Sequence, residues 1–227
     1  LLAGDDTRSA SLADGSVAYA VVDGSHPSLD AAGAQTFLAL EGGQVVAASG
    51  ETTTGREQID PSRGLASVKL GAGEPVTGGD RWQRALQVGR VVLAAEDLGT
   101  AAKAVEMGVE YAKLRTAFGQ PIGAYQAVKH ALVDAYVGVE QLRSLVWWAA
   151  WTADQSPDEL PMASAAAKAY ASQVLEQATT TAIQVHGGIG FTWEHDAHLY
   201  WRRAKVDRLL LGDQVSLLDE VSELALA

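Results

Sequence analysis

Hydrophobic and polar positions follow two different patterns along the chain, and the pattern changes near residue 80. Before it, short hydrophobic runs alternate with segments rich in Gly, Asp, Ser and Thr, which is typical of strands joined by turns. The runs predict strands at 16–22, 36–40 and 44–48, with Gly42-Gly43 as a turn. After Gly79, long Ala-rich segments repeat their apolar residues at helical spacing. These segments predict helices at about 82–113, 123–154, 158–187 and 194–225.

The breaks between the expected helices have local causes. Two glycines and a proline lie in the segment 118–123, prolines interrupt the chain at Pro157 and Pro161, and glycines dominate 187–190. Pro and Gly are the residues that most often end a helix. Long helices with short connections favour an antiparallel bundle. The fold class expected is therefore α+β but mainly α, with a small β domain at 1–79 and an antiparallel four-helix bundle at 80–227.

Composition removes several classes of function. The chain has 17 Lys and Arg against 28 Asp and Glu, a formal charge of −11, so nucleic acid and anionic membrane surfaces would repel it. It has no cysteine, which excludes disulfides and cysteine-bound metals and is compatible with a cytoplasmic location. Its longest apolar tract, 145–153, is about half of the roughly 20 residues that cross a bilayer. We therefore expect no membrane span.

Few residues suggest chemistry by themselves. His195 and His198 are spaced to share a helix face, as two metal ligands would be, but no third ligand accompanies them and a solvated or capping role is the simpler interpretation. The G-x-S-x-G motif of serine hydrolases is absent. The segment 115–122 is more informative, because it places a cation and an aromatic ring beside a sharp loop, and arginine can bind a phosphate through two hydrogen bonds. An ordinary turn between helices is the competing interpretation.

Two motifs together carry a resemblance to a known family. The first is Tyr111-x-x-x-Arg115-x-x-Phe118-Gly119-x-x-Ile122-x-x-Tyr125-Gln126. The second is Gln184-Val185-His186-Gly187-Gly188-Ile189-Gly190-Phe191, followed by Glu194 and Arg202-Arg203-Ala204-Lys205. Over about residues 80–220 the chain resembles the C-terminal helical domain of the acyl-CoA dehydrogenase flavoproteins. Residues before 80 resemble the middle β domain of that family only weakly.

The resemblance implies an FAD-binding oxidoreductase that desaturates acyl-CoA thioesters between the α and β carbons. It also implies an assembly in which each flavin lies across a subunit interface, one chain holding the flavin ring and supplying the base while its neighbour reaches the ADP half. The residues that reach across in this way map onto seven positions of this sequence. They are Arg115 for the pyrophosphate, Phe118 and Ile122 for packing, Gln126 for a polar contact, and Gln184, Gly187 and Gly188 for the ADP portion.

The residues that the family uses within one chain are missing. Leu211 stands where most members have the catalytic Glu, and Gly89, before Arg90, occupies the other place where some members carry it. The Thr-Glu-Pro and Gly-Ser-Asp signatures that cradle the flavin ring have no match in 1–79. Asp213 stands where a hydroxyl residue is common, and a carboxylate there would repel a pyrophosphate. We therefore expect no catalytic residue in this chain.

This asymmetry leads to a specific hypothesis. A chain that keeps only the residues that complete its neighbour's cofactor site resembles the non-catalytic subunit of a heteromeric acyl-CoA dehydrogenase, in α2β2 assemblies like those of actinobacteria that degrade steroid side chains. The expected partners are a catalytic acyl-CoA dehydrogenase subunit, an acyl-CoA substrate such as a steroid-CoA, and an electron-transfer acceptor. Two alternatives stay open. One is an active homotetramer whose base is displaced to Glu96, Asp97 or Asp213, and the other is a flavin-free structural protein.

Overall fold

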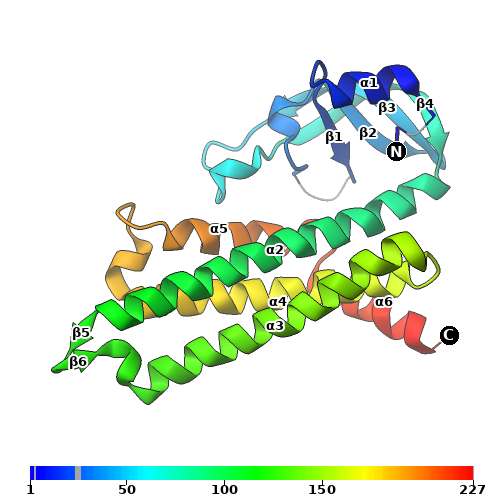
Figure 1. Ribbon diagram of the computed structural model, residues 1–227. Helices are drawn as coiled ribbons and strands as arrows, with labels where there is room; N and C mark the ends of the chain where they lie inside the picture. Colours follow the sequence, from blue (N-terminus) through cyan, green and yellow to red (C-terminus); the bar gives the residue numbers. More distant parts are fainter. Residues whose placement is uncertain (3, 24–26, 227) are drawn as a thin grey trace. The chain divides into compact units, whose positions relative to one another are not determined.

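A four-stranded sheet forms most of the first part of the chain (Figure 1). The computed structural model describes residues 1–2, 4–23 and 27–226, and it divides into two compact units, 1–86 and 87–227. The strands lie in the order in which they follow one another: β1 (Tyr19–Val22), β2 (Thr36–Glu41), β3 (Gln44–Thr53) and β4 (Ser67–Gly78). β1 pairs with β2 in parallel, and the other pairs are antiparallel. The three predicted strands are therefore confirmed.

The turn predicted between β2 and β3 is also confirmed. Gly42 and Gly43 have φ of 56° and 79°, which is the left-handed conformation that a tight hairpin needs at both central residues. Phe37 of β2 is buried and anchors a small core with Ala20, Ala31 and Ala66.

An α-helix and a strand of the first unit were not predicted. Helix α1 (Asp6–Ala13) buries none of its residues and begins where the Asp5 carboxylate accepts the backbone N–H of Arg8 at 2.9 Å. Strand β4 contains Pro75 and several glycines, which argue against a strand in sequence. It lies at the edge of the sheet, where a proline is tolerated, and a Cβ at Gly73 would come within 2.8 Å of Val46.

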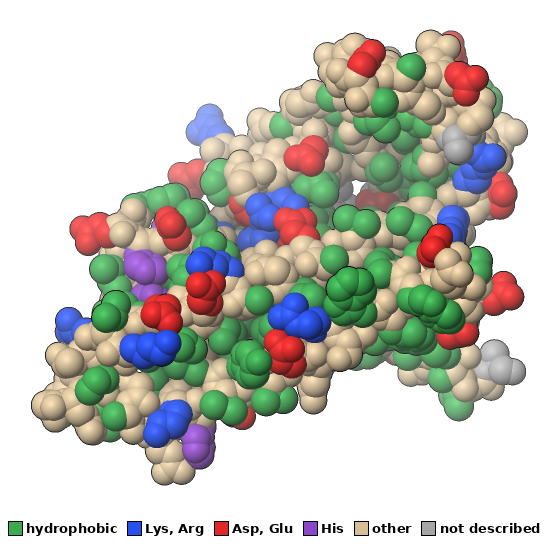
Figure 2. Space-filling model, viewed as in Figure 1, with side chains coloured by type: hydrophobic (Ala, Val, Ile, Leu, Met, Phe, Trp, Pro, Cys, Tyr) green, Lys and Arg blue, Asp and Glu red, His purple; other side chains and the backbone are tan. Residues whose placement is uncertain are grey.

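Three long helices of the second part agree with the prediction. They are α2 (Asp80–Leu114), α3 (Gln126–Gln155) and α4 (Leu160–His186). α4 packs against α3 and against both later helices, and alanines such as Ala163, Ala167 and Ala171 let its neighbours approach closely. Figure 2 shows acidic and basic side chains mixed along the visible face of the helices. Lys103 and Glu106 of α2 form one exposed ion pair. None of the helices in the described part of the chain is long and apolar enough to cross a membrane.

The prediction of one continuous helix at 194–225 was wrong. The chain forms two helices there, α5 (Ala197–Asp207) and α6 (Gln214–Leu226). The described residues from 80 to 226 therefore contain five α-helices where four were expected. Leu211 and Gly212 have φ of 59° and 112°, which no right-handed helix accommodates. Asp213 then begins α6 by accepting the N–H of Val215 and of Ser216. The domain boundary expected at residue 80 stays a prediction.

Candidate functional site

A tight hairpin joins α2 to α3 and carries the first motif. β5 (Thr116–Ala117) pairs with β6 (Gln120–Pro121), and between them Phe118 and Gly119 both have positive φ, 52° and 84°. A non-glycine residue in this conformation is strained, and such strain is concentrated at functional sites. The Phe118 side chain is nevertheless 97% exposed. A strained residue that holds an aromatic ring out in solvent indicates a contact surface for another molecule.

The neighbouring residues of the hairpin divide into exposed and packed ones. Arg115 is exposed, and its guanidinium makes no hydrogen bond or ion pair with any other residue in the described part of the chain. Its carbonyl accepts the N–H of Ile122 at 2.8 Å, which closes the hairpin. Tyr125 donates its hydroxyl to the carbonyl of Ala117 at 3.0 Å and braces the loop from the α3 side.

The second motif forms the end of α4 and the short helix η4 (Gly187–Phe191). Gly187 ends α4 with φ 64° and ψ −141°, a conformation that is almost restricted to glycine. Gly187 and Gly188 are exposed, and a Cβ at either would meet no atom within 4 Å. The space beside their backbone is therefore open to a ligand. Gln184, on the last turn of α4, is exposed as well.

Packing brings the two motifs to one end of the helices (Figure 1). The rings of Tyr111, on α2, and His186, on α4, have centroids 4.4 Å apart. Beneath them Ala112, Leu132 and Val185 form a buried cluster against which Ile122 packs. Ile122 is therefore half-buried between the motifs. Exposed side chains or backbone are presented by Arg115, Phe118, Gln126, Gln184, Gly187 and Gly188.

Histidine and aromatic rings extend this end of the unit, and sequence reasoning missed most of them. His186 contacts His195, with centroids 4.2 Å apart, and its Nδ1 lies 2.7 Å from the carbonyl of Ala182. Burial lowers the pKa of His186, and the nearby imidazole of His195 lowers it further. The hydrogen bond with the Ala182 carbonyl acts in the opposite direction and raises it. His186 is therefore a neutral packing residue at neutral pH.

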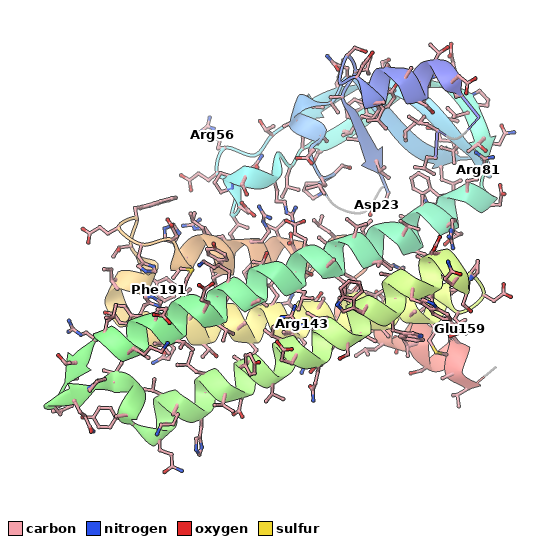
Figure 3. All side chains as sticks on the ribbon, in the orientation of Figure 1. Asp23, Arg56, Arg81, Arg143, Glu159 and Phe191 are labelled. Carbon is pink, nitrogen blue, oxygen red and sulfur yellow. The ribbon has the colours of Figure 1, made fainter. Side chains whose placement is uncertain are left out.

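The ring cluster continues onto α5. Trp193 is 75% exposed, stacks edge-on against His198 at 4.5 Å, and lies beneath the guanidinium of Arg202 at 5.4 Å. Phe191, labelled in Figure 3, meets Trp201 in the same edge-on manner. The only sequence signal was the density of aromatic residues after the glycines. The cluster gives the exposed surface a rigid apolar and cationic flank.

The two histidines weighed as metal ligands have other partners. His195 Nδ1 accepts the N–H of Ala197 at 3.1 Å, which is a capping role at the start of α5. Arg202 Nε donates to His198 Nδ1 at 3.3 Å. Burial lowers the pKa of His198, and the charge of Arg202 lowers it further. Among the described residues no three His, Asp or Glu side chains gather as metal ligands do.

The two positions where the catalytic carboxylate was sought lie together in the structure. A Cβ at Gly89 would lie 3.1 Å from Cδ1 of Leu211, although the two residues belong to α2 and to the turn after α5. Arg90 donates from Nε to the carbonyl of Leu211 at 2.9 Å and forms an ion pair with Glu220, with N–O distances of 2.9 and 3.0 Å. Neither position carries a carboxylate.

The carboxylates considered as displaced bases are engaged elsewhere. Asp213 caps α6, and the hydrogen bonds from Ser216 hold the pKa of its carboxyl below the ordinary value. Glu96 forms an ion pair with Arg203. Asp97 is fully buried, with Oδ2 3.8 Å from Nζ of Lys168. A base must reach the proton it removes, and a capping carboxylate or a fully buried one is poorly suited to that role.

Comparison of the sequence with known proteins gives a family match. Residues 77–225 match the family model described as the C-terminal domain of acyl-CoA dehydrogenase. Acyl-CoA dehydrogenase IpdE2 of Mycolicibacterium smegmatis is 38% identical over 176 residues, which cover 74% of this chain and 54% of that protein. IpdE2 of Mycobacterium tuberculosis is 39% identical over 153 residues, covering 67% of this chain and 45% of that protein. The chain thus spans about half the length of these relatives.

Solved structures share the fold. The ChsE4-ChsE5 complex from Mycobacterium tuberculosis matches with a TM-score of 0.80 and 26% identity, over 93% of this chain and 63% of that one. A variant of Tcur3481-Tcur3483, described as a steroid ACAD, matches with a TM-score of 0.79 and 27% identity, over 92% of this chain and 62% of that one.

Proposed function

The chain belongs to the acyl-CoA dehydrogenase family, and we propose that it is the non-catalytic subunit of a heteromeric enzyme. This subunit lacks the catalytic base and completes the flavin site of a catalytic partner chain. One observation carries the proposal. The exposed surface made by the two motifs is intact, whereas the place where Gly89 and Leu211 meet holds no carboxylate. A chain built in this way can contribute to a cofactor site without performing the reaction itself.

The exposed surface fits the ADP half of FAD. The Arg115 guanidinium is available for the pyrophosphate, and arginine matches phosphate geometry with paired hydrogen bonds. The open backbone at Gly187 and Gly188 lets a bulky ligand approach closely, and Gln184 supplies an amide beside it. Phe118 and the packed Ile122 give the ligand apolar contacts. These residues, with Gln126, would hold the cofactor from across a subunit interface.

When bound, FAD would supply a hydride acceptor for the desaturation of an acyl-CoA thioester. The α proton must go to a carboxylate, which this chain does not place at Gly89 or Leu211, so the partner would supply it. The role of this chain is to position the cofactor and exclude water from its ADP end. A leucine in place of a carboxylate cannot take up a proton at any pH.

Two solved structures support a proposal for the substrate and the assembly. ChsE4 and ChsE5 form a complex of two differently named chains, and Tcur3481-Tcur3483 is described as a steroid ACAD. We propose an α2β2 assembly that acts on an acyl-CoA such as a steroid-CoA and passes electrons to an electron-transfer acceptor. A homotetramer with a displaced base is disfavoured, because Glu96 and Asp213 hold structural hydrogen bonds or ion pairs.

The flavin content of the purified protein tests the proposal. We expect the chain alone to be colourless and its co-purified complex with the partner to hold about one FAD per two chains, measured from flavin absorbance and protein mass. Arg115→Ala should lower flavin retention of the complex, whereas Arg56→Ala, at an exposed position of the first unit, should not. A chain that by itself holds one FAD per chain and oxidises an acyl-CoA would show the proposal to be wrong.

A further inference from the structure

An apolar groove lies between α2 and α3, close to the hairpin that joins them. Figure 1 shows the two helices side by side, and the groove between them has a volume of about 590 Å³. Its apolar lining comes from both helices, with Val105 and Val109 on α2 and Leu132, Val133 and Tyr136 on α3. Sites for small molecules have volumes of about 300–1,000 Å³ and mostly apolar linings, so a groove of this kind can hold one.

The hairpin bounds one end of the groove. The short helix η3 (Ile122–Ala124) lies there, and Gly123 and Ala124 line the groove beside Pro121. A Cβ at Gly123 would come within 3.1 Å of the carbonyl oxygen of Ala112, so the glycine lets η3 approach α2 closely. Closely packed backbone therefore forms this end of the groove.

The two charged residues that the structure places in the lining are lysines, and both lie at the hairpin end. Lys113 is on the last turn of α2 and Lys129 on the first turn of α3, and both are exposed. Lys113 forms an exposed ion pair with Glu110 at 2.7 Å, whereas Lys129 makes no ion pair with a residue that the structure describes. Among the described residues no carboxylate lines the groove, although the whole chain has 28 Asp and Glu against 17 Lys and Arg. The charge of the groove is therefore opposite to that of the chain.

Charge and apolar surface are separated along the groove. Val105 is eight residues before Lys113 on α2, and Tyr136 is seven residues after Lys129 on α3. At 1.5 Å per residue, the apolar lining extends about 10–12 Å away from the lysines along the two antiparallel helices. Such a groove is complementary to a molecule that has an anionic group at one end and an apolar body at the other.

We propose that this groove binds an amphipathic carboxylate, with the carboxylate group beside Lys113 and Lys129 and the apolar body along Val109 and Val133. Removal of the apolar body from water supplies most of the affinity, because it is the dominant favourable contribution in most associations. The two ammonium groups set the orientation and select against cationic molecules, which they repel. The proposal does not depend on the proposed function, since the residues assigned to the flavin are not among those that line the groove.

Titration calorimetry of the full chain tests the role of charge, with dodecanoate kept below the concentration at which it forms micelles. Dodecanoate should bind, and dodecyltrimethylammonium, which has a similar tail and the opposite charge, should bind at least about tenfold more weakly. Lys129→Ala should weaken dodecanoate binding about fivefold. Lys103→Ala removes an exposed lysine of α2 that does not line the groove, and it should change nothing. Equal binding of the two amphiphiles, or unchanged binding by Lys129→Ala, would overturn the proposal.

A single introduced thiol locates the bound dodecanoate, since the chain has no cysteine. Val133→Cys places the thiol in the groove, and Trp147→Cys places one on the same helix outside it. The two side chains are 51% and 72% exposed, so neither change removes a fully buried core residue. Dodecanoate should slow the reaction of iodoacetamide with the first thiol and leave the second unaffected. Protection of both thiols, or of neither, would show that dodecanoate does not occupy the groove.

The complex with the catalytic partner distinguishes a small-molecule site from a contact between chains. If the groove is a ligand site, the complex should bind dodecanoate as tightly as the chain alone, to within about threefold. Binding that is present in the chain alone and lost in the complex would mean that a protein surface fills the groove, and the proposal would be wrong. The flavin content of the same complex tests the proposed function separately, so the two can fail independently.

Discussion

Lys168 places an amine inside the helical unit, and its replacement tests how three helices are held together. Its side chain and that of Asp97 are fully buried, with Nζ 3.8 Å from the Asp97 carboxylate. Nζ also donates to Ser172 Oγ at 2.7 Å and to the carbonyl of Asp207 at 2.9 Å. Asp97 belongs to α2, Lys168 and Ser172 to α4, and Asp207 to α5. One ammonium group therefore links three helices in the middle of the core.

The expected cost of Lys168→Met follows from these contacts. Methionine keeps most of the volume but removes the charge, and breaking a buried ion pair by deleting one partner costs about 3–5 kcal/mol. A domain has about 5–15 kcal/mol of total stability, so the single variant should lose a large share of it. Changing both residues, Asp97→Leu with Lys168→Met, removes both charges of this pair. The double variant should lose only about 1–3 kcal/mol, chiefly for the carbonyl of Asp207 that no longer has its donor.

Urea unfolding followed by tryptophan fluorescence measures both costs, and the double-mutant cycle isolates the pair. Lys103→Met removes a lysine from the exposed pair with Glu106 and should leave the unfolding midpoint unchanged. A double variant that is no more stable than Lys168→Met would refute the reasoning, because the penalty would then come from packing or from Ser172 and Asp207 and not from the charge on Asp97.

Three further outcomes are expected. Burial lowers the pKa of His186 and of His198, so the unfolded chain binds more protons than the folded chain as the pH falls through about 6.5. The urea midpoint should therefore decrease between about pH 7.5 and pH 5. A midpoint that does not change with pH would contradict this. Phe118→Gly relieves the strain of a positive φ, so the melting temperature should stay the same or rise by a few degrees. Flavin retention by the complex should fall. A lower melting temperature together with lower flavin retention would mean that the Phe118 ring has a structural role. Asp213→Asn keeps a side chain that can cap α6 and should leave the dehydrogenation rate per flavin unchanged. Asp213→Ala removes the cap and should lower the melting temperature. Loss of activity in Asp213→Asn would identify the Asp213 carboxylate as a base.

The parts of the fold that could be predicted are those where local pattern and tertiary packing agree. The alanine-rich periodicity of α2, α3 and α4 matched their length, and prolines and glycines marked their ends. The break between α5 and α6 was missed because Leu209, Leu210 and Leu211 continue an apolar helical pattern, and only the backbone shows that Leu211 adopts a positive φ. Strand β4 was missed for the opposite reason, since pairing with β3 overrides the weak strand preference of its glycines and Pro75.

Parts of the candidate site could be predicted from the sequence, whereas contacts between distant segments could not. Motif spacing predicted Arg115, Phe118 and the glycines at 187–188 as site residues, because each motif places a particular residue type at a particular place in the chain. Their role stays a prediction, and the structure shows that these positions are exposed. Motif spacing could not reveal that Tyr111 and His186 hold the two segments together, since that contact joins helices 75 residues apart. The stacking of Arg202 on Trp193 is likewise a product of the turn after η4 and has no sequence signature.

The meeting of Gly89 and Leu211 bears most directly on catalysis. The resemblance implied two alternative places for one carboxylate, and the structure brings both to within van der Waals reach of each other. Two places that serve the same substrate carbon should converge in this way, so the contact supports their assignment as the base position. Arg90 is tied there to the Leu211 carbonyl and to Glu220, which accepts two hydrogen bonds from it. Under the proposed function, catalysis by this chain would require a new carboxylate at Leu211, because neither Leu211 nor Gly89 carries one.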